Sequence, residues 1–314
     1  MTDPERQSAP ETREVSRLTA ILLAVAALVW TAGMLLSARI KITGWADAEM
    51  EVTSTAYALP GTVAAAIVAG AAVALLVLTL VGARRQLGAT ARFAVGTGSG
   101  LLAGVLCALP IVTINTDGTI YAAVGGTLAA AATIGGALAG FRIPPVIAAA
   151  GWATLGVFVI GSVLNTKQIQ NPLLDLFGND STEAAANANQ YFSYAQSALS
   201  GLAAGLIAFA VLRRARRRAG ADLRWPFYLI AGAGAGLLSV IAEVLTRTAG
   251  AQVLDLAGKV SDLERSVQQI LGANRLNSAL IVLFLGAFTA MIAVGRTLSP
   301  APDEDEDEEV PAAS

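Results

Sequence analysis

Long apolar stretches, separated by short charged or polar segments, dominate the chain. Each apolar stretch runs for about 20 residues, which as an α-helix crosses a hydrocarbon core about 30 Å thick. The eight stretches are 18–38, 61–81, 93–113, 122–140, 145–164, 195–212, 227–245 and 278–294. We therefore predict an all-α polytopic integral membrane protein with about eight transmembrane helices, surrounded by membrane lipids.

The composition supports this prediction. Only 14 % of the 314 residues are charged, 55 % are hydrophobic and the mean hydropathy is +0.62. About a quarter of the residues in an average soluble domain are charged, so water is not the main solvent of this chain. Its single cysteine, Cys107, rules out an intramolecular disulfide. The chain has no histidine, and therefore lacks the commonest general base and metal ligand.

Basic residues gather in alternate loops, and this bias predicts the orientation, because positively charged loops stay in the cytoplasm. Fourteen of the 21 basic residues fall on one side: Arg6, Arg13, Arg17, Arg84, Arg85, Arg92, Arg142, Arg213, Arg214, Arg216, Arg217, Arg218, Arg224 and Arg296. Both termini are then cytoplasmic. Abundant alanine and arginine, with only three lysines, are typical of a GC-rich genome and favour a bacterial plasma membrane.

Two pairs of segments resemble each other along the chain. Residues 93–104 match 229–240 at a shift of 136, with three glycines and a Leu-Leu pair in common. Residues 58–67 match 198–207 at a shift of 140. A tandem duplication of four helices explains both matches, and would place a pseudo-twofold axis along the membrane normal. Chance similarity within alanine- and glycine-rich sequence is the alternative.

These patterns divide the chain into four parts. We predict a cytoplasmic N-terminal tail over 1–17, a first four-helix half over 18–143, a second half over 144–296 and a cytoplasmic tail over 297–314. The last part contains seven consecutive acidic residues, 303–309, and like charges at this density predict disorder. The run is either a solvated end or a docking segment for a basic partner.

A heptad pattern follows the seventh apolar stretch. Apolar residues recur there at spacings of three and four: Val253, Leu256, Val260, Leu263, Val267 and Ile270. This periodicity predicts an amphipathic external helix over 252–271. Such a stripe favours contact with a protein partner or with a second copy of the chain.

Glycines recur every four residues in the third and seventh apolar stretches, at Gly96, Gly100 and Gly104 and at Gly232 and Gly236. Glycine lets helix backbones approach closely, so tight helix packing is one interpretation. The other interpretation is a transporter binding site, because glycine-interrupted helices at equivalent positions of two halves mark such sites. We retain these five glycines as candidate binding residues.

Glu243 is the one acidic residue inside an apolar stretch. A charge in hydrocarbon costs at least about 2.5 kcal/mol, so Glu243 requires a partner. Arg247 lies four residues later, on the same helix face. The two residues predict either a structural ion pair or an external proton or cation site.

No catalytic motif, cofactor-binding loop or cluster of metal ligands is present in the sequence. The arginines of 213–218 lack interleaved aromatics, so a nucleic-acid partner is not expected. Two functions are consistent with the sequence. One is a non-enzymatic membrane subunit or scaffold that packs through small-residue helix faces and the external helix. The alternative is a transporter for a small or lipidic solute, with its site between the halves near the third and seventh helices.

Overall fold

The computed structural model describes residues 15–44, 48–115, 118–178, 181–219 and 224–297, and these segments are helical with no strand among them. Their helices are α1 (Arg17–Thr43), α2 (Ala48–Gly82), α3 (Ala89–Val112), α4 (Thr119–Ala139), α5 (Pro144–Leu164), α6 (Lys167–Leu176), α7 (Thr182–Ala219), α8 (Trp225–Thr248), α9 (Ala251–Gly258) and α10 (Asp262–Gly295). All but α6 and α9 are long and apolar enough to cross a membrane. They coincide with the eight predicted stretches, so the prediction of a multi-pass all-α membrane protein is confirmed.

Helices are the expected solution because lipid offers no partner for backbone N–H and C=O groups. Their ends carry the usual sequence signals. Ser16 caps α1 by accepting a hydrogen bond from the N–H of Thr19 at 3.3 Å. Proline stands in the first turn of α5 and of α8, where no intrahelical donor is lost.

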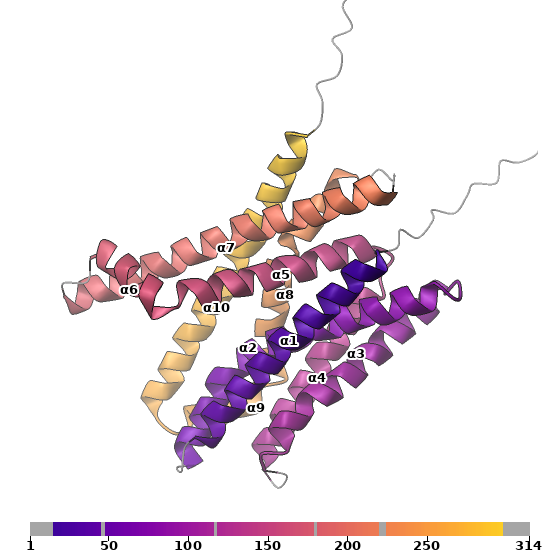
Figure 1. Cartoon of the computed structure of the whole chain (residues 1–314). Coiled ribbons are helices and arrows are strands. Elements are labelled where there is room, and N and C mark those ends of the chain that lie inside the picture. The colour runs from indigo at the N-terminus through magenta and orange to yellow at the C-terminus, as the bar shows by residue number, and fades with distance from the viewer. Residues whose placement is uncertain (1–14, 45–47, 116–117, 179–180, 220–223, 298–314) are drawn as a thin grey trace, which may run out of the picture.

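The transmembrane helices form two groups, α1 to α4 and α5, α7, α8 and α10 (Figure 1). In each group the first helix packs on the second, the second on the fourth, and the third on the fourth. This correspondence is what a four-helix duplication would produce, although the duplication itself stays a prediction. The acidic run 303–309 lies outside the described residues.

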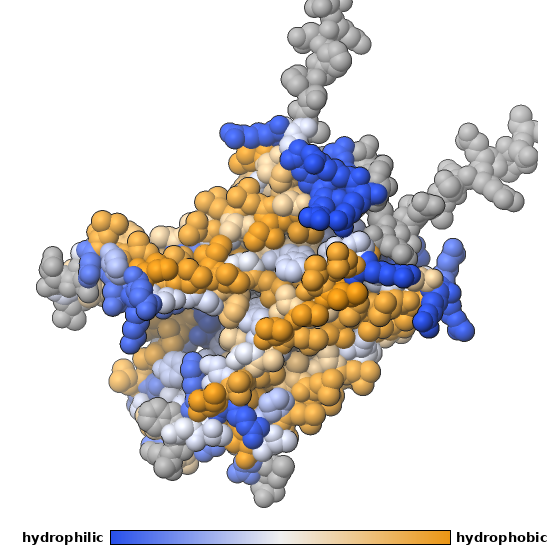
Figure 2. Space-filling model, viewed as in Figure 1, coloured by the Kyte–Doolittle hydropathy of each residue, from blue (hydrophilic) through white to orange (hydrophobic). Residues whose placement is uncertain are grey.

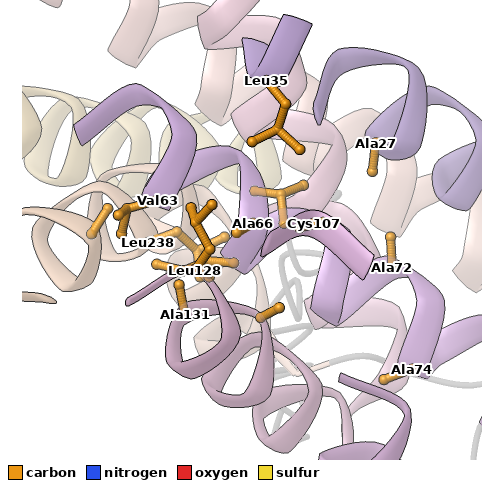
Figure 3. Packing of buried hydrophobic residues seen from close by; sticks show 14 of the residues in the cluster. Ala27, Leu35, Val63, Ala66, Ala72, Ala74, Cys107, Leu128, Ala131 and Leu238 are labelled. Carbon is orange, nitrogen blue, oxygen red and sulfur yellow. The ribbon is translucent and has the colours of Figure 1, made fainter. Parts of the chain in front are cut away.

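Each group has its own apolar core, and α2 lies where the two groups meet. Two thirds of the apolar window of α2 is buried, the largest share among the spanning helices of the described chain. Val63 of α2, Leu128 of α4 and Leu238 of α8 pack together in the larger core, so this core joins both groups (Figure 3).

Apolar side chains also cover much of the outside of the molecule, whereas polar residues gather toward the ends of the helices (Figure 2). Leu102 and Leu106 of α3 and Phe284 and Phe288 of α10 are among the large exposed apolar side chains. Such a belt suits hydrocarbon as the solvent.

The C-terminal end of α7 lies beside the start of α1, where Nη1 of Arg218 is 3.5 Å from the hydroxyl of Ser16. We call this end of the bundle the arginine-rich end. At the opposite end the hydroxyl of Tyr57 on α2 donates to Glu264 on α10 at 3.3 Å, which ties the two groups together. Arg218 and Ser16 therefore lie at the same end of the bundle, as the predicted alternation of basic loops requires.

The prediction of one external helix over 252–271 is wrong, because the helix is interrupted in the middle of that range. α9 ends at Gly258, and α10 begins after Ser261, whose hydroxyl accepts the N–H of Glu264 at 3.0 Å. α10 then continues without interruption into the last transmembrane span. The capping serine explains the break, since it satisfies a free N–H of a new helix.

The break also divides the predicted apolar stripe. Val253 is fully buried in the larger core, whereas Leu263 and Ile270 on α10 are 75 % and 60 % exposed. The remaining members are half-buried: Leu256, Val260 and Val267. The six residues therefore do not form one continuous docking stripe.

The predicted glycines bring helix backbones into contact. A Cβ atom on Gly96 would lie 2.7 Å from the carbonyl oxygen of Gly136 on α4, and one on Gly100 would lie 2.5 Å from that of Ala132. The third glycine of this series, Gly104, also packs on α4. In the second group Gly232 and Gly236 pack in the same way on Gly286 and Leu283 of α10.

Replacing Gly96 by Ala should destabilise the protein, because the new methyl group overlaps backbone that cannot move alone. We expect a loss of about 1–3 kcal/mol, the usual cost of overpacking. The matched control is Gly98→Ala on the same helix, where no atom lies within 4 Å of the added Cβ. Thermal unfolding in mild detergent should show a lower midpoint for Gly96→Ala alone. Equal midpoints would contradict the assigned packing.

Candidate functional site

The buried carboxylate of Glu243 on α8 is the centre of an ion cluster with two half-buried arginines. Only 5 % of its side chain is exposed. Oε1 accepts from Nε of Arg247 at 2.8 Å, and Oε2 accepts from Nε of Arg275 on α10 at 2.9 Å. The predicted pairing of Glu243 with Arg247 is confirmed, and we call the three residues the charge triad.

Arg275 is the member of the charge triad that the sequence did not predict. It stands 32 residues from Glu243, in the short segment between the predicted external helix, 252–271, and the last apolar stretch, which begins three residues later. Its position became clear only because α10 is continuous from Asp262 into the membrane. A basic residue one turn from an apolar stretch was the available signal.

Gly272 makes room for the charge triad. A Cβ atom there would lie 3.1 Å from both Nη2 of Arg247 and Oε1 of Glu243. The α10 backbone therefore approaches the ion pair on α8 directly, and a larger side chain at 272 would have to displace it. Two guanidinium groups share one carboxylate, so the triad carries a net charge of +1.

A cavity of about 500 Å³ with a mixed polar and apolar lining lies between the second group of helices and α2, with Glu243 and Arg275 in its wall. It corresponds to the recess below the N-terminal part of α7 in Figure 2. Its neutral polar lining comes from α7, α8 and α10: Ser193, Gln196, Ser197, Ser200, Ser239, Asn274 and Ser278. We call this space the central cavity.

A second hollow of about 560 Å³ lies on the other side of the charge triad, toward the end opposite the arginine-rich end. Its charged lining consists of the triad together with Asp255, Lys259 and Arg265. Gln268, which is buried in this wall, donates to Glu264 but leaves its own Oε1 without a hydrogen-bond partner. Since Glu243 and Arg275 line both spaces, the triad stands between this outer hollow and the central cavity.

The packing of small residues explains where the helices separate. Toward the arginine-rich end, Gly205 of α7 and Gly232 of α8 both contact the α10 backbone at Gly286, so the three helices meet there. Pro60 contributes to the opposite wall of the central cavity. Because proline has no N–H, it leaves the carbonyl group of Ala56, one turn earlier in α2, without its helical donor.

A third space, of about 580 Å³, lies between α1, α2 and α3 and is almost wholly apolar. Arg39 lines it, but its Nη1 already donates to the carbonyl of Pro110 at 2.6 Å. Exposed Leu102 and Leu106 form part of its wall, so this groove faces lipid. It is a poor match for a polar solute.

The predicted site residues thus fall into two sets. Glu243 and Arg247 belong to the charge triad, whereas Gly96, Gly100, Gly104, Gly232 and Gly236 line neither polar space and serve helix contacts. Within the described ranges, no three acidic or cysteine side chains converge as metal ligands would. No known protein family, curated protein or solved structure matches the chain significantly.

Replacing Glu243 by Gln should lower the free energy of unfolding by about 1.5–3 kcal/mol, because the buried carboxylate accepts two charged hydrogen bonds, although the arginines that donate them are 45 % and 32 % exposed. The control is Asp262→Asn, which removes the 3.4 Å pair of a 99 % exposed aspartate with Arg265. An exposed pair contributes at most about 1 kcal/mol. Denaturant titration in detergent micelles measures both values. A Glu243→Gln variant as stable as the control would show that the Glu243 carboxylate is hydrated rather than buried.

Proposed function

We propose that the protein is a non-enzymatic transporter that carries a small polar solute through the central cavity. The observation that carries this proposal is the position of the charge triad, between the outer hollow and the central cavity at the contact of the two helix groups. Ionisable and polar side chains are costly within a membrane and generally mark a substrate path. We also place the protein in a bacterial plasma membrane with both termini in the cytoplasm, on the bias of its basic loops.

In this proposal the charge triad is an external gate. The bond between Glu243 and Arg275 joins α8 to α10, so breaking it would connect the outer hollow with the central cavity. The glycine contacts of α7 and α8 with α10 close the arginine-rich end. Transport would then require the helix groups to rock about α2, so that the cavity opens to one side at a time.

The lining of the central cavity supports a polar cargo. Seven neutral polar side chains, together with Glu243 and Arg275, line a space large enough for a small organic molecule. α2 and α7 contribute equivalent positions, since Pro60 aligns with Ser200 at the shift of 140 and both line the cavity. Sites between related halves, near the middle of the membrane, are the rule among transporters built from repeats.

A transporter must expose its central cavity to both sides of the membrane, and this gives the test. In a Cys107→Ser background, Ser239→Cys places a thiol in the cavity wall. We expect a small membrane-impermeant methanethiosulfonate to modify it in right-side-out and in inside-out vesicles. Leu237→Cys, on the exposed face of α8, is the control and should not react, because a thiol in hydrocarbon does not ionise. Reaction from one side only would contradict transport.

A membrane subunit or scaffold is the second candidate function, and one observation favours it. Leu263 and Ile270 lie seven residues apart, on one face of α10, and both are highly exposed. Their helix begins at the end opposite the arginine-rich end, before the last apolar stretch. Two large apolar side chains outside the hydrocarbon core would suit a protein partner or a second copy.

If the protein acts as a subunit, the double variant Leu263→Ser and Ile270→Ser should lose its partner. The apolar contact area would disappear while the transmembrane core is untouched. Leu176→Ser on α6 is the matched control, since Leu176 is also highly exposed. The mass of the complex purified from native membranes in mild detergent decides the outcome. An unchanged mass in the double variant would rule out this surface as the contact.

A further inference from the structure

We infer that the solute is a small anion with a single negative charge, and that Arg275 binds it. This inference rests on the proposed transport function and names the substrate class of the same cavity. It follows from the charge balance of the triad. Arg247 and Arg275 contribute two positive charges and Glu243 one negative charge, so the group lacks one negative charge.

Adding a monoanion would complete this balance. If the anion takes Arg275, Glu243 still keeps Arg247 at 2.8 Å, and the four charges form two neutral pairs. A cation would instead have to take Glu243 from two guanidinium groups and would leave both uncompensated. A neutral solute would leave the excess charge as it is. Among the three classes, only the anion therefore opens the bond between Glu243 and Arg275 without leaving an unpaired charge in the wall.

Arg275 is placed to make this exchange. Its side chain is 32 % exposed and lines both the outer hollow and the central cavity. Only its Nε is engaged by Glu243, and no other hydrogen bond of Arg275 is found among the described residues. Guanidinium Nη groups donate in a planar fork that matches carboxylate and phosphate oxygens. Arg275 can thus bind the anion while it separates from Glu243.

The outer hollow favours the approach of an anion. Its lining contains four basic residues, Arg247, Lys259, Arg265 and Arg275, against two acidic residues, Asp255 and Glu243. The difference, four minus two, gives a net charge of +2 at the entrance. A recess whose net charge has one sign raises the local concentration of the opposite ion, by about 10-fold at the lower end of the usual range. The entrance and the gate therefore select for the same charge.

The test compares two thiol reagents of similar size and opposite charge, 2-sulfonatoethyl and 2-(trimethylammonium)ethyl methanethiosulfonate. They are applied to the full-length Cys107→Ser, Ser239→Cys protein in vesicles. The rate of modification by the anionic reagent is divided by the rate for the cationic reagent. This ratio is then divided by the same ratio for Asn189→Cys, an exposed position on α7. Because both reagents attack the same thiolate, its degree of ionisation cancels in each ratio. We expect the anionic reagent to be favoured by about 10-fold.

Removing either arginine makes the triad neutral, so Arg275→Gln and, independently, Arg247→Gln should each abolish most of this preference. Arg275→Lys keeps the charge and should retain it. A ratio at or below one in the starting protein, or a ratio unchanged in the folded glutamine variants, would overturn the anion inference and leave the transport proposal intact. No reaction with either reagent would mean a sealed cavity, and both proposals would then fail.

Discussion

The close approach of helix backbones at glycine is the contact on which the rest of the structure depends. Lipid chains are as apolar as leucine, so hydrophobicity does not draw one transmembrane helix to another, and dense packing must do so instead. Gly96 lies against Gly136 in the first group of helices, and Gly232 lies against Gly286 in the second. Both groups use their third and fourth helices for this contact, and the remaining helices pack around these two pairs.

The central cavity follows from the limits of this packing. The glycines of α8 that hold it against α10 lie in the half of the helix nearer the arginine-rich end. Beyond them the sequence of α8 brings Ser239 and Glu243, which line the cavity instead of closing it. The bundle therefore combines a dry, tightly packed region with a polar one along the same pair of helices. The charge triad is tolerable there because each oxygen of its carboxylate accepts a charged hydrogen bond.

Much of the fold could be predicted from the sequence, because a hydrocarbon core imposes a length of about 20 apolar residues on every crossing. The external helix could not be predicted correctly from its periodicity alone. The heptad pattern continued across the interruption between α9 and α10. The better signal was Ser261, whose hydroxyl caps the new helix by accepting the N–H of Glu264. The pairing of Glu243 with Arg247 followed from helix spacing, whereas Arg275 depends on how α10 is rotated against α8. No local pattern records that rotation.

The distance along α8 between Gly236 and Glu243 is seven residues, about 20° short of two complete turns. The contact that presses α8 against α10 therefore also aims the carboxylate at Arg275. Inserting or deleting one residue between them would turn Glu243 by about 100° and point it away from α10, although every side chain needed for the triad would still be present. The geometry of the triad therefore depends on the length of this segment as well as on the identity of its residues.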